Sequence, residues 1–318
     1  MNGTATSKIQ DFPAPYCYYA YAGLKDGGVD YMHYGYWTSD TRTIVEAQEN
    51  LADLMKSYIP VGIQTILDSG CGLGRTTWDL KTKGFNVTGI SPDRELILEA
   101  QRRYPELAQQ FVCTRLEDFN ATSQFDLVFF QESSQYIDVK VLFERLGKLV
   151  KADGFVLICD EVRYSNKPRL FNKKLDMLEF ATINGFTLKR QEVITDKVLP
   201  TRTFFPKYLR DNLSDIVHQF SVTKRDVRHE VLELAAGWDE STEFFNSGDC
   251  GYEIFLFQKT KPASTGLNSW LTGAKYIARR KLRNGWSRLH SRWQAMLADI
   301  PQMNSKTGAK SYYSVGFS

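Results

Sequence analysis

Short apolar stretches alternate with helical patterns between about residue 44 and residue 190, and this alternation most narrows the folds open to the chain. Many residues of the apolar stretches are β-branched, which is typical of strands buried on both faces of a sheet. Strands that alternate with helices predict an α/β fold with a doubly wound sheet. We expect strands at 65–70, 86–90, 111–116, 125–130, 154–160, 187–194 and 252–259, and helices at 75–84, 93–103, 139–151 and 169–184.

Local patterns also predict where some of these elements begin and end. Asp138 precedes the helix expected at 139–151 and is a candidate N-cap, and Ala-Asp-Gly at 152–154 predicts the end of that helix. Segment 195–250 lies between the last two expected strands and is long and mixed in character. We interpret this segment as an insertion that covers a pocket.

Composition excludes several classes of protein. The chain has 318 residues, 42% of them apolar, which is enough for a sizeable core, and its net charge of +3 is too small to imply a nucleic-acid partner for the whole chain. Its five cysteines never form a CxxC pair, which favours reduced thiols in the cytoplasm. The four histidines stand at no metal-ligand spacing, so we expect no metal site built by the protein. We also expect neither a signal peptide nor a membrane-spanning segment.

The sequence ILDSGCGLG at 66–74 is the strongest local motif. An expected strand ends near Asp68, and Gly70, Gly72 and Gly74 follow where a helix should begin. Glycines allow a sharp turn and the close approach of a ligand, and the first turn of a helix offers free N–H groups. No Gly-Lys-Ser/Thr follows, which excludes a phosphate-binding loop, and the third glycine is spaced wrongly for a dinucleotide-binding dehydrogenase.

This motif resembles the first motif of class I S-adenosylmethionine-dependent methyltransferases, usually written D/E-x-G-x-G-x-G. Later segments keep the order of that family: FDLVFF at 125–130 is similar to its fourth strand, and LGKLVKADGFVLI at 146–158 to its helix, glycine turn and fifth strand. The resemblance covers about residues 30 to 260. It implies a Rossmann-like sheet of seven strands, mostly parallel with one antiparallel strand, with S-adenosylmethionine as cofactor and S-adenosylhomocysteine as product.

The resemblance also implies which residues bind the cofactor. RLEDF at 115–119 follows the third strand, where the family places an acid on the adenine amino group, and Asp118 is the best match. Many members hold the ribose with an acid after the second strand; here Ser91 and Pro92 stand in that turn, and the next residue, Asp93, either binds the ribose or only caps the helix. The expected cofactor-binding residues are Tyr36, Asp68, Ser69, Gly70, Gly72, Gly74, Ser91, Pro92, Asp93, Leu116, Glu117, Asp118 and Gln131.

The polar segment FQESSQYID at 130–138 directly follows the fourth apolar stretch. In this fold ligands bind beyond the carboxyl ends of the strands, so we expect the segment at the methyl end of the cofactor. It resembles prenyl-diphosphate C-methyltransferases, whose pattern is matched by Glu132, Ser133 and Tyr136, better than tocopherol-type methyltransferases, where a histidine stands in place of Gln135. In the prenyl branch the glutamate stabilises a cation and takes its proton after methyl addition to an alkene. The alternative for Glu132 is a solvated loop acid.

The aromatic segment DYMHYGYW at 30–37 is similar to a lid over the cofactor in several small-molecule methyltransferases. Aromatic rings attract a sulfonium through cation–π interactions. His33 is either an alternative base or a hydrogen-bonded structural histidine. The candidate catalytic residues are therefore Glu132 and His33, and the candidate substrate-binding residues are Tyr34, Trp37, Tyr136, Arg163 and Arg169. The two arginines either clamp a diphosphate, the one case in which we expect Mg²⁺, or lie in a solvated basic loop.

Beyond residue 261 the chain has an apolar stripe at helical spacing, and its other positions up to 298 are basic or uncharged. Such a helix either lies on an anionic membrane surface or packs on protein, including a second subunit. The expected organisation is an N-terminal cap at 1–60, a methyltransferase domain at 61–260 that includes the lid insertion 195–250, and a basic amphipathic tail at 261–318.

These observations predict methyl transfer to a small, apolar or prenyl-type acceptor by C-methylation. O-methylation of a hydroxyl or phenol is the first alternative. An RNA methyltransferase anchored by the basic tail is an alternative of another class, but the segment after the fourth strand lacks the N/D-P-P-Y motif of base methylation. An inert binding or scaffold protein would not need the glycine loop together with Asp118 and Glu132. We expect a cytoplasmic protein, or one peripheral to a membrane through its tail.

Overall fold

The computed structural model describes residues 15–25, 28, 30–165, 171–221 and 226–260. The chain divides into two compact units, 1–261 and 262–318, and the second unit lies outside the described residues. The tail predicted at 261–318 therefore stays a prediction. Within the described ranges, none of the helices has both the length and the apolar character that crossing a bilayer requires.

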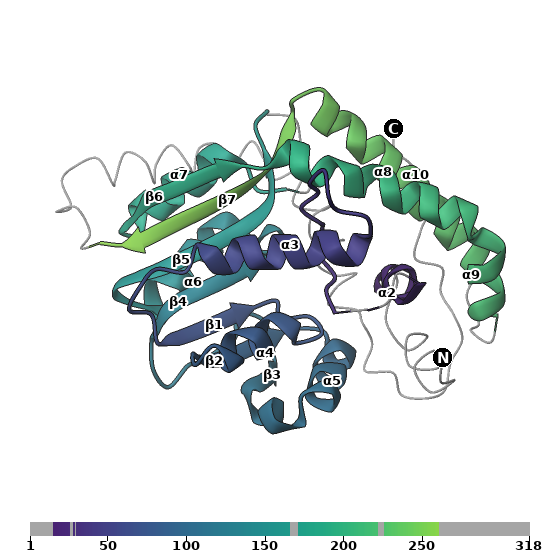
Figure 1. Ribbon diagram of the computed structural model, residues 1–318. Helices are drawn as coiled ribbons and strands as arrows, with labels where there is room; N and C mark the ends of the chain where they lie inside the picture. The colour runs from purple at the N-terminus through teal and green to yellow at the C-terminus, as the bar shows by residue number, and fades with distance from the viewer. Residues whose placement is uncertain (1–14, 26–27, 29, 166–170, 222–225, 261–318) are drawn as a thin grey trace. The chain divides into compact units, whose positions relative to one another are not determined.

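A seven-stranded sheet forms the centre of the first unit, in the strand order β3-β2-β1-β4-β5-β7-β6 (Figure 1). Strands β1 to β5 pair in parallel, and β7 runs antiparallel between β5 and β6. The predicted sheet, mostly parallel with one antiparallel strand, is confirmed. The strands are β1 (Thr65–Ser69), β2 (Asn86–Ser91), β3 (Phe111–Cys113), β4 (Phe125–Gln131), β5 (Val150–Arg163), β6 (Phe186–Val193) and β7 (Cys250–Lys259).

Helices follow most strands, as the alternation predicts. They are α2 (Tyr16–Lys25), α3 (Ile44–Ser57), α4 (Arg75–Thr82), α5 (Arg94–Arg103), η1 (Pro105–Gln110), η2 (Ser134–Tyr136), α6 (Val139–Leu149), α7 (Lys174–Ile183), α8 (Thr195–Asp211), α9 (Leu213–Gln219) and α10 (Val227–Asn246). The Asp138 carboxylate accepts hydrogen bonds from the backbone N–H groups of Lys140 and Val141, at 3.0 and 3.3 Å. The predicted N-cap of α6 is thereby confirmed.

The predicted end of that helix is wrong. Helix α6 ends at Leu149, and β5 begins at Val150 and continues through Ala-Asp-Gly at 152–154. Asp153 adopts a φ of +61°, and the register between β4 and β5 shifts at this point, so the extra residues form a bulge inside the strand. The three residues therefore change the direction of a strand instead of ending a helix. The strand expected at 111–116 is also shorter, since β3 ends at Cys113.

The segment between β6 and β7 forms the three helices α8, α9 and α10, which carry the residues expected to be an insertion. Figure 1 shows α8 and α10 side by side with α2 close to them. Residues of α2 share an apolar cluster with these helices and with Leu73 of the glycine loop and Leu96 of α5. The insertion and α2 therefore pack together near the glycine loop.

Candidate active site

The glycine loop between β1 and α4 takes backbone conformations that require glycine. Gly70, Gly72 and Gly74 have φ values of +88°, +52° and +81°. A Cβ atom on Gly70 would lie 2.3 Å from the Cβ of Ser133, whereas a Cβ on Gly72 would meet no atom within 4 Å. Gly70 thus allows β1 to approach the segment after β4, and Gly72 borders open space in which a ligand can approach the backbone.

Asp68 and Ser69, at the end of β1, are buried. The Thr77 hydroxyl donates to the Asp68 carboxylate at 2.6 Å, and burial raises the pKa of Asp68 to about 6. The Ser133 hydroxyl donates to the Ser69 carbonyl at 2.5 Å. These contacts connect the glycine loop with α4 on one side and with the segment after β4 on the other.

Asp93 caps helix α5. One carboxylate oxygen, Oδ1, accepts from the backbone N–H groups of Glu95 and Leu96, both at 3.0 Å. Within the described ranges the other oxygen makes no hydrogen bond, so capping leaves one oxygen of Asp93 available to a ribose. Ser91 is buried and its hydroxyl accepts from the Asp93 N–H at 3.3 Å, whereas Pro92 is exposed.

Arg145 of α6 fixes the backbone of the turn after β3. Arg145 donates to the carbonyl of Leu116 at 3.4 Å and to that of Phe119 at 2.5 Å. Leu116 is buried, Glu117 is half-buried, and Asp118 is exposed. The turn therefore has a fixed backbone and an accessible acid, as an adenine contact requires.

Gln131 ends β4, and both polar atoms of its side-chain amide are buried without a hydrogen-bond partner among the described residues. Buried amides normally have partners, so this one needs a ligand or a water molecule. The orphaned amide and the open space beside Gly72 both fit S-adenosylmethionine bound at the carboxyl ends of β1 and β4.

Glu132 adopts a φ of +57°, a left-handed conformation that costs a residue other than glycine about 1–3 kcal/mol and is concentrated at functional sites. Its Oε1 atom accepts from the backbone N–H of Tyr34 at 2.5 Å and from the hydroxyl of Tyr252. Burial raises the pKa of Glu132 well above its usual range, although these two donors oppose the shift. These contacts do not match a solvated loop acid. Tyr252, on β7, was not among the predicted site residues.

A second acid, Glu161, lies near Glu132 and was also not predicted. The Tyr34 hydroxyl donates to Glu161 at 2.8 Å, and the buried guanidinium of Arg202 forms an ion pair with it. Burial raises the pKa of Glu161, and the charge of Arg202 acts in the opposite direction. Tyr34 therefore contacts Glu132 through its backbone and Glu161 through its side chain.

Asp160, the neighbour of Glu161, holds the segment that carries Glu132. Its carboxylate accepts from the Ser134 hydroxyl at 2.7 Å and from the Gln135 N–H at 3.0 Å. Burial raises the pKa of Asp160 to about 7. Its position and its three acceptor bonds, one of them from its neighbour's N–H, indicate a structural role.

His33 is buried, and its Nδ1 lies 2.6 Å from the carbonyl oxygen of Tyr34. Burial lowers its pKa to about 4, so the ring is neutral and Nδ1 carries the hydrogen in this contact. Among the described residues, Nε2 has no hydrogen-bond partner. The geometry fits the hydrogen-bonded structural histidine, and the role of His33 as a base stays a prediction.

The remaining predicted residues lie in different surroundings. The Trp37 indole donates to the Thr201 hydroxyl at 2.8 Å and packs among aromatic residues of the insertion. Tyr36 packs against the core, Tyr136 is 42% exposed, and Arg163 is buried at the end of β5 and does not lie in a solvated loop. Arg169 lies outside the described residues.

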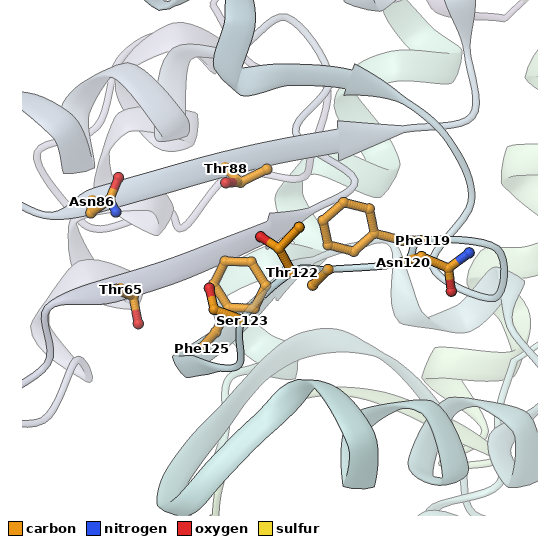
Figure 2. A pocket seen from close by; sticks show the side chains of 9 residues that line it. Thr65, Asn86, Thr88, Phe119, Asn120, Thr122, Ser123 and Phe125 are labelled. Atoms are coloured by element: carbon orange, nitrogen blue, oxygen red, sulfur yellow. The ribbon is translucent and has the colours of Figure 1, made fainter.

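A hollow of about 210 Å³ lies elsewhere on the sheet (Figure 2). Thr65, Asn86 and Phe125 line it, and these residues begin β1, β2 and β4. The hollow is therefore near the amino ends of these strands, whereas the glycine loop and Glu132 follow the carboxyl ends. It contains none of the predicted site residues.

This fold and this set of residues define a class I methyltransferase architecture, with the glycine loop, the exposed acid after β3 and Gln131 arranged around one edge of the sheet. Residues 67–158 match the family described as "Methyltransferase domain", and the prediction of a methyltransferase domain is confirmed over these residues.

Curated relatives match parts of the chain. The ubiquinone biosynthesis O-methyltransferase of Bradyrhizobium diazoefficiens is 29% identical over 107 residues, which are 33% of this chain and 42% of the relative. The magnesium-protoporphyrin O-methyltransferase of Rhodobacter capsulatus is 29% identical over 114 residues, 34% of this chain and 51% of the relative. The chain thus spans less than half the length of the first relatives it matches.

Solved structures resemble the fold more fully. The cyclopropane synthase MmaA2 from Mycobacterium tuberculosis has a TM-score of 0.64 at 17% identity, covering 81% of this chain and 100% of the other. A geranyl diphosphate methyltransferase in complex with GPP and sinefungin has a TM-score of 0.58 at 15% identity, covering 80% and 98%. At these identities the likeness concerns the fold alone.

Proposed function

We propose that the protein transfers a methyl group from S-adenosylmethionine to a small, apolar or prenyl-type acceptor, and that Glu132 accepts the proton that the acceptor loses. The observation that carries the proposal is the way Glu132 is held. Oε1 takes both hydrogen bonds, from Tyr34 and Tyr252, while Oε2 makes none within the described part of the chain. One oxygen is fixed and the other is available to the acceptor.

S-adenosylmethionine bound at the glycine loop would supply the methyl group. The acceptor would attack the methyl carbon in line with the C–S bond, whose electron pair would go to sulfur as S-adenosylhomocysteine leaves. In C-methylation the π electrons of an alkene form the new carbon–carbon bond, which leaves a carbocation on the acceptor. Oε2 of Glu132 then takes a proton from the carbon next to the cation, and the electrons of that C–H bond restore the alkene. The ionised glutamate also stabilises the cation electrostatically before the proton moves.

The residues around Glu132 support this role in two ways. Tyr34 and Tyr252 stack with ring centroids 5.4 Å apart, and aromatic faces stabilise a nearby cation. The Tyr252 hydroxyl and the Tyr34 N–H favour the ionised carboxylate, which is the form that can accept a proton. A positive sulfonium bound nearby would act in the same direction as these donors, against the burial that raises the pKa of Glu132.

O-methylation is a second candidate, because the curated relatives are named as O-methyltransferases of ubiquinone and magnesium-protoporphyrin biosynthesis. In that reaction Glu132 would take the proton of a hydroxyl or phenol as its oxygen attacks the methyl group. The two candidates share the base and differ in the acceptor.

Methyl-labelled S-adenosylmethionine offered with separate pools of prenyl diphosphates, prenyl alcohols and phenols distinguishes them. We expect label in a product whose new methyl group is bound to carbon, which fragmentation of the product in mass spectrometry identifies. A methyl ether formed from a phenol would replace C-methylation by the second candidate. Label in no small-molecule pool would contradict the proposal.

A further inference from the structure

The insertion helix α8 is connected to Glu132 through a continuous set of buried contacts. Arg202 of α8 is 2% exposed and donates from Nη1 to Glu161 of β5 and, at 2.5 Å, to the hydroxyl of Tyr34. The N–H of Tyr34 donates in turn to Glu132. Only one residue, Tyr34, stands between the ion pair and the proposed base.

The neighbour of Arg202 holds the same segment from the other side. The Thr201 hydroxyl accepts from the backbone N–H of Gly35 at 3.1 Å and from the Trp37 indole at 2.8 Å. The backbone N–H of Trp37 donates to the carbonyl of Lys197, one turn earlier in α8, at 2.8 Å. Helix α8 therefore fixes both the side chain of Tyr34 and the backbone that follows it.

Arg202 is itself held in one position. Its Nη2 donates to the Ser241 hydroxyl of α10, and its guanidinium lies 4.1 Å from the ring centroid of Phe245. Glu161 neutralises its charge, which a buried guanidinium requires. Its Nε lacks a hydrogen-bond partner among the described residues, but its charge is already paired with Glu161, so its effect on the reaction passes through its neighbours.

We infer that Arg202 is a positioning residue for Glu132, acting through Glu161 and Tyr34, so that the docking of the insertion on the sheet sets the geometry and charge of the proton acceptor. This inference rests on the proposed role of Glu132. It gives the insertion a function in the reaction in addition to the cover that the sequence predicts.

Several titratable groups surround Glu132, and the pH dependence of its variants must be considered against all of them. They are Tyr16 of α2, Tyr34 of the segment 30–37, Tyr136 of η2, Cys159, Asp160 and Glu161 of β5, and Tyr252 of β7. Of these, Glu161 is the acid that Arg202 neutralises directly. The negative charge of Glu161 raises the pKa of Glu132, so changes to the pair alter the pH at which Glu132 ionises.

The experiment compares the pH dependence of kcat/KM for Arg202→Gln, Glu161→Gln and the double variant, with Glu132→Gln measured in the same assay. The acid limb of the kcat/KM profile, where activity rises with pH, reports the ionisation of Glu132. Arg202→Gln leaves the negative Glu161 without its cation, so we expect this limb to move to higher pH. Glu161→Gln removes the negative charge and leaves Arg202 facing Tyr34, so we expect the limb to move to lower pH. The double variant removes both charges and should lie closer to the wild type than either single variant.

Two further variants separate positioning from a loss of folding. Tyr34→Phe keeps the aromatic ring and the N–H to Glu132 but removes the contact with Glu161 and Arg202, and we expect kcat to fall by about 10²-fold at most, with an unchanged affinity for S-adenosylhomocysteine. Arg202→Lys keeps the charge and should retain the wild-type acid limb with a reduced kcat. These variants stay informative if Arg202→Gln does not fold.

The outcomes are distinct. Opposite movements of the acid limb, with Glu132→Gln nearly inactive, support the inference. If the acid limb stays in place in Arg202→Gln, Glu161→Gln and the double variant, and Tyr34→Phe keeps full kcat, the inference is overturned and the proposed function is left intact. Full activity of Glu132→Gln overturns the proposed function and the inference with it.

Discussion

At the scale of single residues, the backbone conformation and the hydrogen bonds of Glu132 together direct its carboxylate. Its left-handed φ turns the chain away from β4 as soon as the strand ends, and its N–H still donates to the Cys159 carbonyl of β5 at 2.9 Å. The carboxylate is thereby directed toward Tyr34 and Tyr252. A residue with a relaxed backbone at this position would place the acid differently.

The glycine loop gives the first prediction. Gly72→Val places a branched side chain in the open space beside the loop and should abolish S-adenosylhomocysteine binding. Gly84→Val is the matched control, because Gly84 also has a positive φ and no atom within 4 Å of an added Cβ, but it lies in the turn after α4. Calorimetry should show lost binding for the first variant only. Wild-type affinity in Gly72→Val would contradict the assignment of the loop.

Asp160 gives a prediction about pH and stability. Its folded-state pKa of about 7 exceeds the usual value near 4, so between these values the folded protein binds the proton more tightly than the unfolded chain. This contribution to the free energy of unfolding is complete near pH 4 and is lost as the pH rises toward 7. Asp160→Asn should therefore show a flatter decline of Tm between pH 4 and pH 7 than the wild type.

The control for that measurement is Asp126→Asn. Lys151 and the Thr65 and Gln64 groups lower the pKa of Asp126 to about 2, so this group loses its stabilising effect only as the pH falls below about 4. Its substitution should alter Tm by a constant amount above pH 4. If Asp160→Asn kept the wild-type slope, the carboxyl would be ionised throughout this range.

At the scale of elements, a network of charges attaches the segment 30–37 to the helices beneath it. Asp79 of α4 accepts from the Tyr31 hydroxyl at 3.0 Å, from Lys56 of α3 at 2.8 Å and from Arg75 at 2.9 Å. Asp30 forms a further ion pair with Arg75. The segment that carries His33 and Tyr34 is thus fixed at its start by α3 and α4 and at its end by α8.

We predict that Asp79→Ala destabilises the protein by about 3 kcal/mol, because it leaves the nearly buried Lys56 ammonium and Arg75 without their common acid. Asp53→Ala is the control, since Asp53 also pairs with Lys56 but is 73% exposed, and an exposed pair contributes about 0–1 kcal/mol. Urea unfolding measures both. Equal effects of the two substitutions would show that Asp79 does not have this role.

The elements also show what the sequence could and could not predict. Asp138 and the glycine loop were predicted because a cap and a tight turn depend on residues a few positions apart. Ala-Asp-Gly at 152–154 was misinterpreted because a strand bulge and a helix end share the same residue types. The catalytic role of Glu132 was predicted from a resemblance over a short stretch.

The residues that contact Glu132, and those that contact Glu161, could not be predicted from the sequence. Tyr252 is 120 positions from Glu132, and Arg202 is 41 positions from Glu161, so only the pairing of β5 with β7 and the docking of α8 bring them together. A single arginine in a helix also gives no local sign that it is buried, since arginines are mostly exposed. The sequence therefore predicted the fold and the glycine loop far better than the surroundings of the proposed base.

At the scale of the whole molecule, the tail at 261–318 remains a proposal from the sequence. Its apolar stripe and basic positions suit docking on protein or on an anionic surface. We predict that the full chain sediments with anionic vesicles more than with neutral ones, and that a truncation after Lys261 does not. Equal and negligible sedimentation of the full and the truncated chain would remove the membrane hypothesis, whereas loss of a dimer on truncation would assign the apolar stripe to a protein interface.

The central claim is that one acid, Glu132, accepts the proton in methyl transfer to a small molecule, and its most direct test is the turnover of Glu132→Gln with the acceptor identified by labelling. The substitution keeps the shape of the side chain and removes its ability to accept a proton, so we predict a fall of at least about 10²-fold in turnover with unchanged affinity for S-adenosylhomocysteine. Glu240→Gln, at an exposed position of α10, should behave as the wild type. Turnover of Glu132→Gln within a few-fold of the wild type would contradict the account.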